Sequence, residues 1–181
     1  MTRMNYRRDA QNLREQLRLA ERQGRKIYFM DEICFTKRSI LSRDWSRANS
    51  NLSISQSDIF VGYRAVIASM NEHWGIKVYD IKKQAITADD FAAYLKKMRA
   101  SNFNRPLALF MDNLPVHKSN IVKPLYDSLN IMPIYNVSYS PELNPIEAVF
   151  SKVKAIFNRQ RLNHLVNKTD FDADKAIRRA F

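Results

Sequence analysis

Five segments of the chain carry the apolar pattern that is typical of β-strands. They are short, rich in β-branched and aromatic residues, and bounded by polar or turn-forming stretches. Residues 71–75 (NEHWG) separate the second segment from the third, and this turn predicts a hairpin. The predicted strands span residues 26–35, 60–70, 75–81, 106–111 and 131–137.

Other segments repeat apolar residues at helical spacing. Leu13, Leu17 and Ala20 recur in this way ahead of Gly24, a plausible helix stop, and residues 87–90 (TADD) form a capping-box pattern. Three strands followed by alternating helices and strands predict an α/β fold, with a mixed five-stranded sheet flanked by helices. The predicted helices span residues 3–23, 87–98, 119–129, 144–161 and 171–181.

Two stretches stand apart from this alternation. Residues 1–24 are rich in arginine and predict a basic N-terminal helix or linker, either facing DNA or lying in solvent as an arm. Residues 37–59 form a long polar insertion with many serines, and structureless loops of that length are usually functional or disordered. We therefore expect one domain of ordinary size over residues 25–181, interrupted by this loop.

The charge of the chain indicates a polyanionic partner. Among 181 residues there are 30 Lys and Arg against 18 Asp and Glu, which gives a net charge of +12. Such a balance favours nucleic acid first and an acidic membrane surface second.

Composition also excludes several classes of protein. The chain has no apolar run of about 18 residues, which excludes a membrane-spanning helix. A single cysteine, Cys34, excludes an internal disulfide framework and fits a reducing, intracellular compartment. With 3 glycines, the chain contains neither of the two glycine-rich phosphate-binding motifs, so we expect no nucleotide cofactor.

Two carboxylates occupy apolar surroundings. Asp31 lies within the first predicted strand and Asp112 follows the fourth. Sites of open α/β sheets form at the carboxyl ends of strands, so these two residues meet if the strands are neighbours. Adjacent carboxylates repel each other, and a divalent cation relieves that repulsion. Because only oxygen ligands are available, Mg²⁺ or Mn²⁺ is expected.

A third acid is expected near residue 144, where Glu142 and Glu147 are the candidates. Glu147 lies about three positions into the predicted helix, where its side chain can turn toward the sheet. However, Asn144-Pro145-Ile146-Glu147 also reads as a helix capping box, with Asn144 as N-cap. The spacing leaves both roles for Glu147 open.

Residues 112–119 (DNLPVHKS) and 139–147 (YSPELNPIE) resemble the two hallmark segments of mariner-like transposases and their bacterial insertion-sequence relatives. These are DDE-type enzymes, and their second and third acids are separated by 34 residues, as Asp112 and Glu147 are here. Residues 29–32 (FMDE) resemble the strand of the first acid, and residues 61–65 and 150–154 also fit. The similarity extends from about residue 26 to residue 181.

The resemblance implies an RNase H-like fold in which Asp31, Asp112 and Glu147 are catalytic and hold two Mg²⁺ or Mn²⁺ ions. It implies metal-dependent phosphoryl transfer: strand cleavage at transposon ends, then attack of the 3′-hydroxyl on target DNA. Relatives act as dimers, and they usually carry upstream helix-turn-helix domains, which we do not find in this sequence. A nuclear location is expected in a eukaryote, or the cytoplasm and nucleoid in a bacterium, without a membrane partner.

Basic and aromatic residues near these motifs are candidates for DNA contact. A solvated helix face is the alternative for the basic residues after position 151, and a hydrogen bond at a helix start is the alternative for His117. Two other functions stay open: a domesticated DNA-binding protein without transposition activity, and an RNase H-like nuclease without strand transfer. The candidate DNA-contacting residues are Arg38, Arg43, Trp45, Arg47, His117, Lys118, Lys152, Lys154, Arg159 and Arg161.

Overall fold

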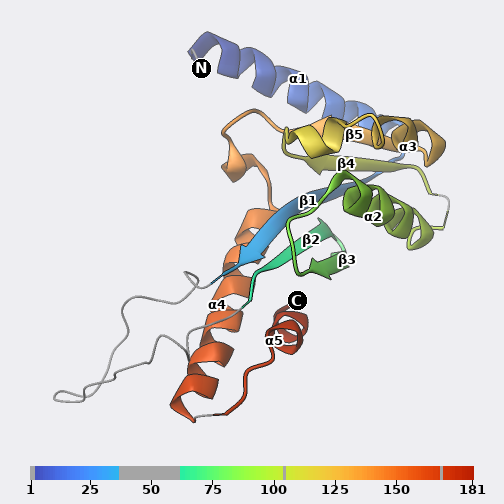
Figure 1. The fold of residues 1–181 in the computed structure, drawn as a ribbon. Coiled ribbons are helices and arrows are strands. Elements are labelled where there is room, and N and C mark those ends of the chain that lie inside the picture. The colour runs from blue at the N-terminus through green and yellow to red at the C-terminus, as the bar shows by residue number, and fades with distance from the viewer. Residues whose placement is uncertain (1–2, 37–61, 104, 168) are drawn as a thin grey trace.

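A single mixed sheet organises the domain. The computed structural model describes residues 3–36, 62–103, 105–167 and 169–181. The sheet has five strands in the order β3-β2-β1-β4-β5, which confirms the predicted architecture (Figure 1). The strands are β1 (Lys26–Phe35), β2 (Arg64–Asn71), β3 (Gly75–Lys82), β4 (Leu107–Met111) and β5 (Ile131–Tyr135).

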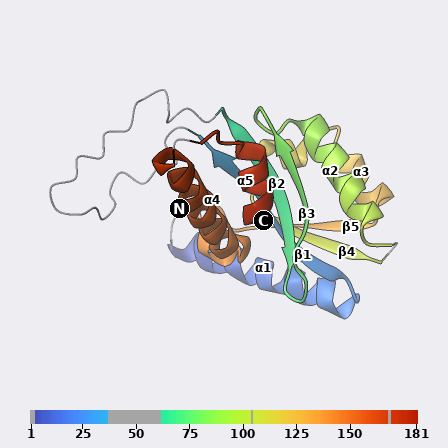
Figure 2. The same cartoon turned by 90° about the horizontal axis from the view of Figure 1, so that it is seen from below.

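Helices cover both faces of the sheet. In Figures 1 and 2, α2 and α3 lie on one face, while α1, α4 and α5 lie on the other. Two short 3-10 helices, η2 (Pro115–Lys118) and η3 (Pro141–Leu143), follow β4 and β5. The α-helices are α1 (Arg3–Arg22), α2 (Ala88–Ala100), α3 (Lys123–Ser128), α4 (Ile146–Val166) and α5 (Ala173–Ala180).

The central strand β1 supplies apolar side chains to both layers. Tyr28 and Met30 are buried against the α2 face, whereas Ile33 and Phe35 are buried with residues of α4 and α5. Because successive side chains of a strand point to opposite faces, a continuous apolar run is what a strand covered on both faces requires. Charged residues in the middle of this run are therefore surrounded by packed elements.

The predicted neighbour relation between the first and fourth strands is confirmed. β1 pairs with β4 in parallel, with Lys26 opposite Leu107 and Phe29 opposite Phe110. β1 pairs on its other side with β2 in antiparallel orientation, and β2 and β3 form the predicted hairpin. Extending the parallel register by two positions brings Asp31 level with Asp112. The pairing of these strands thus brings both aspartates to the same level of the sheet.

The N-terminal helix forms as predicted, but it is not a separate arm or linker. Leu13 and Ala20 of α1 are buried together with Phe110 of β4 and Ile134 of β5. The apolar face of this helix therefore completes the core over the parallel half of the sheet, and its arginines occupy the outer side. The expected boundary after residue 24 does not separate two packing units, because burial of α1 stabilises the strands beneath it.

Two local features differ from the expected elements. The predicted helix over residues 119–129 is shorter, because α3 begins at Lys123 with Pro124 in its first turn. Proline has no backbone N–H and favours the start of a helix over its interior. The predicted capping box before α2 is present, with Thr87 and Asp90 bonded reciprocally. None of the helices in the described part of the chain is long and apolar enough to cross a membrane.

Candidate active site

Asp31 lies in the middle of β1, on the face of the sheet that α4 covers. Its Oδ1 atom accepts a hydrogen bond from the backbone N–H of Glu32 at 2.8 Å. Its Oδ2 atom accepts one from the Asn144 side-chain amide at 3.2 Å. Asn144 also donates to the carbonyl of Met30 at 3.2 Å, so its buried side-chain amide connects the segment just before α4 to β1.

The pKa of Asp31 is raised from its ordinary value to about 7. Burial is the largest cause, and the negative charges of Glu32, Asp112 and Glu147 add to it. A carboxyl group with this environment is held at a free-energy cost that a bound cation relieves. Perturbed groups of this kind are frequent at functional sites.

Asp112 follows the last residue of β4 and is half-exposed, at 37% of its side-chain surface. Its Oδ1 atom accepts from the backbone N–H of Leu114 at 3.2 Å and lies 3.1 Å from Nδ1 of His117. The residue follows the strand instead of lying within it. Its negative charge raises the pKa of Asp31, and its carboxylate contacts His117.

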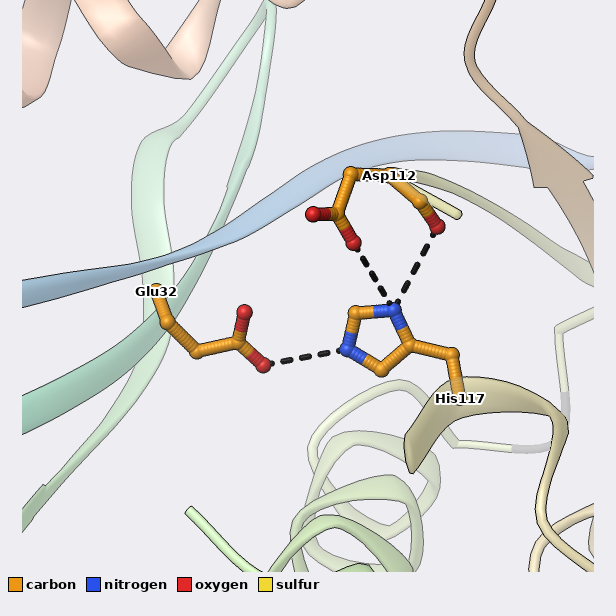
Figure 3. Close-up of side chains that lie close together, drawn as sticks. All are labelled: Glu32, Asp112 and His117. Carbon is orange, nitrogen blue, oxygen red and sulfur yellow. Dashed lines mark hydrogen bonds and ion pairs between the residues drawn. The ribbon is translucent and has the colours of Figure 1, made fainter. Parts of the chain in front are cut away.

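His117, in η2, lies between two carboxylates (Figure 3). Its Nε2 atom is 3.0 Å from Oε1 of Glu32, and its Nδ1 atom faces Asp112. Burial alone lowers the pKa of this histidine, but the hydrogen bonds and charges of Asp112 and Glu32 outweigh burial and raise the pKa to about 9. The ring is therefore an imidazolium at neutral pH.

Glu32 points away from Asp31, because successive side chains of a strand alternate between faces, and Glu32 pairs with His117. Only 13% of the Glu32 side-chain surface is exposed. Its Oε1 atom is the one that meets the imidazole. Two consecutive residues thus contribute to two different environments on either side of β1.

Glu147 lies in the first turn of α4 and is exposed. The alternative role for it is not realised: Pro145 is the N-cap of α4, without a side-chain capping hydrogen bond. Asn144, the expected cap, turns instead to Asp31 and Met30. Glu147 is close enough for its charge to raise the pKa of Asp31, which supports the assignment of Glu147 over Glu142 as the third acid.

The three predicted acids surround one region without forming a closed cluster. In the described part of the chain, the one set of three potential ligand groups within 4.8 Å of one another is Glu32, Asp112 and His117. The negative charges of Asp112 and Glu147 act on Asp31 at longer range. Like charges repel, and Asp112 is drawn to the cationic ring of His117.

The structure divides the predicted DNA-contacting residues into three groups. Lys118, Lys152, Lys154 and Arg159 are exposed. By contrast, the His117 side chain is fully buried and Arg161 is only 2% exposed, so neither presents a surface for DNA in this conformation, because packing has enclosed them. Lys154 is seven positions after Glu147, which places the two on the same face of α4. Arg38, Arg43, Trp45 and Arg47 lie outside the described residues.

Sequence reasoning missed two contributors to the site. Asn144 reads as a helix cap, and only its tertiary contact with β1 reveals that it orients Asp31. The joint role of Glu32 and His117 was also missed, although both lie next to motif residues. Two signals in the sequence point to this pair. His117 lies five positions after the candidate metal ligand Asp112, and Glu32 is adjacent to Asp31.

The donor atoms around Asp31 fit a hard divalent cation. Asp31, Asp112 and Glu147 offer carboxylate oxygens, which are the ligands that Mg²⁺ and Mn²⁺ prefer. Burial and, after it, the nearby negative charges raise the pKa of Asp31, and a bound cation would favour its ionised form.

Solved structures of known proteins share this fold. A Mos1 transposase paired-end complex with the left transposon end matches with a TM-score of 0.65 at 15% identity, covering 99% of this chain and 59% of that one. The Mos1 transposase catalytic domain with raltegravir and Mn matches at 0.63 and 14% identity, covering 99% and 80%. A simian T-cell lymphotropic virus intasome matches at 0.59 and 15% identity, covering 86% and 46%.

These matches confirm the predicted RNase H-like architecture, and the chain spans about half the length of the transposase and intasome chains in the two complexes. No curated protein sequence matches the chain significantly. A family model described as "DDE superfamily endonuclease" matches residues 26–167, which include Asp31, Asp112 and Glu147. The chain therefore belongs to the DDE superfamily of endonucleases.

Proposed function

We propose that this chain is the catalytic domain of a DNA transposase that cleaves DNA at transposon ends and joins the freed end to target DNA. The observation that carries the proposal is that Asp31 of β1 is level with Asp112, which follows the parallel strand β4, and that the charges of Asp112 and Glu147 both act on Asp31. Family membership supports the nuclease chemistry, and the likeness to Mos1 transposase supports transposition.

Asp31, Asp112 and Glu147 would hold Mg²⁺ or Mn²⁺, two ions per site. When bound, such ions stabilise the attacking and leaving oxygens of an in-line phosphoryl displacement. Structures of the Mos1 catalytic domain with Mn and with Mg are consistent with this choice of metal. The chain contributes the carboxylates, and Asn144 orients the most buried of them, Asp31, through a hydrogen bond.

Two displacements at phosphorus complete the proposed reaction. In the first, a water oxygen attacks the scissile phosphate, the bond from phosphorus to the 3′-oxygen breaks, and that oxygen leaves as a 3′-hydroxyl. In the second, this hydroxyl attacks a phosphate of target DNA, forming a new phosphodiester and releasing a target 3′-hydroxyl. Each step breaks one phosphorus–oxygen bond and forms one, so no nucleotide cofactor is required.

DNA would approach over the exposed basic residues near the site. Lys154 follows Glu147 along one face of α4, and Lys118 lies in η2 behind Asp112. Phosphate contacts by such residues position DNA without reading its sequence. We further propose that two copies act together and that the protein works where DNA is accessible, in a nucleus or a nucleoid.

The proposal is tested by incubating the chain with supercoiled plasmid and a labelled duplex that carries a free 3′-hydroxyl, with Mg²⁺ or Mn²⁺. We expect metal-dependent nicking and transfer of the label to the plasmid. Nicking without label transfer would favour a nuclease without strand transfer, and DNA binding without nicking would favour a domesticated DNA-binding protein.

A matched pair of substitutions localises the chemistry. Glu147→Gln should abolish nicking, whereas Glu142→Gln should leave it unchanged, because Glu142 is an exposed residue of η3 and lies outside the proposed triad. Equal loss in both variants would contradict the assignment of the third acid.

A further inference from the structure

The imidazole of His117 is held in one orientation by its surroundings. The side chain is fully buried, and its ring packs on the ring of Phe91 in α2, with the centroids 4.5 Å apart. The hydroxyl of Tyr126 donates to the His117 carbonyl at 2.9 Å, which anchors the backbone of η2. The ring therefore has little freedom to rotate away from its two carboxylate partners.

Both ring nitrogens are engaged by acidic oxygens. Nε2 faces Glu32 at 3.0 Å, and Nδ1 faces Oδ1 of Asp112 at 3.1 Å and the Asp112 carbonyl at 3.4 Å. Figure 3 shows each ring nitrogen joined to an acidic residue, Nε2 to Glu32 and Nδ1 to Asp112, so both nitrogens are already engaged within the protein.

Asp112 needs such a partner. Its side chain is half-exposed and follows a strand end, where a carboxylate is free to rotate unless it is bonded. The Leu114 N–H and His117 both contact Oδ1, which restrains the carboxylate and leaves Oδ2 outside these two contacts. Histidine or carboxylate groups that orient a ligand from behind are a general feature of metal sites.

We propose that Glu32 and His117 are positioning residues, which together orient the carboxylate of Asp112 for metal binding. The inference rests on the proposed function, since it assumes that Asp112 is a metal ligand. Glu32 acts through the imidazole: it holds Nε2, and the opposite nitrogen holds Asp112. Glu32, which is next to the first proposed catalytic acid, Asp31, thereby helps to orient the second one, Asp112.

Mn²⁺ binding to the intact chain without DNA tests this, with the signal of free Mn²⁺ measured by electron paramagnetic resonance. We expect Glu32→Ala to weaken binding about tenfold. Glu32→Gln keeps an acceptor oxygen for Nε2, so it should restore affinity to within about threefold of the parent chain. Equal losses in the two variants would indicate that only the charge of Glu32 matters, and would overturn the inference.

Two control variants complete the binding experiment. Glu72→Ala removes an exposed glutamate that also pairs with a histidine, His73, and it should leave Mn²⁺ affinity unchanged. Asp112→Asn should remove most of the binding. If the parent chain shows no Asp112-dependent Mn²⁺ binding, the proposed function fails; if that binding is present and Glu32→Ala does not weaken it, only the positioning role fails.

A measurement on the parent chain covers the case in which a variant does not fold. With ¹⁵N-labelled histidine, nuclear magnetic resonance should show both nitrogens of His117 protonated before and after addition of Mg²⁺. Loss of the proton from either nitrogen on Mg²⁺ binding would make His117 a ligand and overturn the positioning role.

Discussion

Asp31 and Glu32 are consecutive residues of one strand, yet they lie in opposite electrostatic environments. Asp31 faces α4, and its pKa is raised to about 7 by burial first and then by the negative charges of Glu32, Asp112 and Glu147. Glu32 faces the α2 side, where it meets the imidazolium of His117 at 3.0 Å. On one side of the strand the buried acid has only like charges near it, while on the other side the acid has a cationic partner.

The difference separates a binding site from its support. Repulsion among acids costs stability unless a cation is bound, and proteins accept such costs where function needs them. In the Glu32–His117–Asp112 row, the imidazolium lies between the two acids and offsets part of their negative charge within the fold. Substitutions on the two sides of β1 should therefore change stability in opposite directions.

The largest expected effect is on catalysis. Asp31→Asn should lower metal-dependent nicking by at least about a thousandfold, because it removes a charged ligand. The same substitution should stabilise the metal-free protein by about 1–2 kcal/mol, because a buried charge near like charges is removed. Asn144 can accept from the new amide, since its Oδ1 atom has no hydrogen-bond partner among the described residues. Gel assays and thermal unfolding with chelator measure the two effects, and a destabilised Asp31→Asn protein would contradict the comparison.

A substitution on the Glu32 side of β1 should instead lower the stability of the metal-free protein. His117→Ala should destabilise the metal-free protein by about 2–4 kcal/mol, because it leaves Glu32 without its cationic partner in a mostly buried position. Chemical denaturation measures the change. His73→Ala, at an exposed Glu–His pair, is the control and should change stability by less than about 0.5 kcal/mol.

The pH dependence of metal-free stability should resolve both sides. Asp31 has a folded pKa of about 7 against an ordinary value of 3.8, so its contribution is complete below about pH 4 and is lost as the pH rises through 7. His117 has a folded pKa of about 9 against 6.5, so its contribution is complete below about pH 6.5 and is lost as the pH rises through 9. Asp31→Asn should flatten the lower part of this decline and His117→Asn the upper part, in denaturation curves recorded from pH 4 to 9.

The smallest effect is expected on DNA affinity. Lys154→Gln should weaken DNA binding about threefold and lower the salt dependence by about one counterion, because Lys154 lies on the Glu147 face of α4. Fluorescence anisotropy at several salt concentrations measures both. Lys123→Gln is the control, since α3 covers the other face of the sheet, and an equal effect there would show that only net charge matters.

The local elements were accessible from sequence, and so were the three candidate acids. Strands 26–35 and 106–111 follow from apolar runs, the α2 cap follows from Thr87 and Asp90, and the motif around residues 139–147 points to Glu147. The packing of α1 on β4 and β5 was not accessible, because an amphipathic basic helix does not specify which surface it covers. The roles of Asn144 and His117 likewise depend on partners more than 80 residues away.

The order of residues by itself determined that Asp31 lies within one strand, that Asp112 follows another, and that Asp31 and Glu32 point to opposite faces, since alternation along a strand is a local property of the backbone. Only the tertiary structure decided what each of them meets. The electrostatic environment of a carboxylate is set by groups brought close through packing, and here packing placed an imidazolium beside Glu32 and like charges beside Asp31.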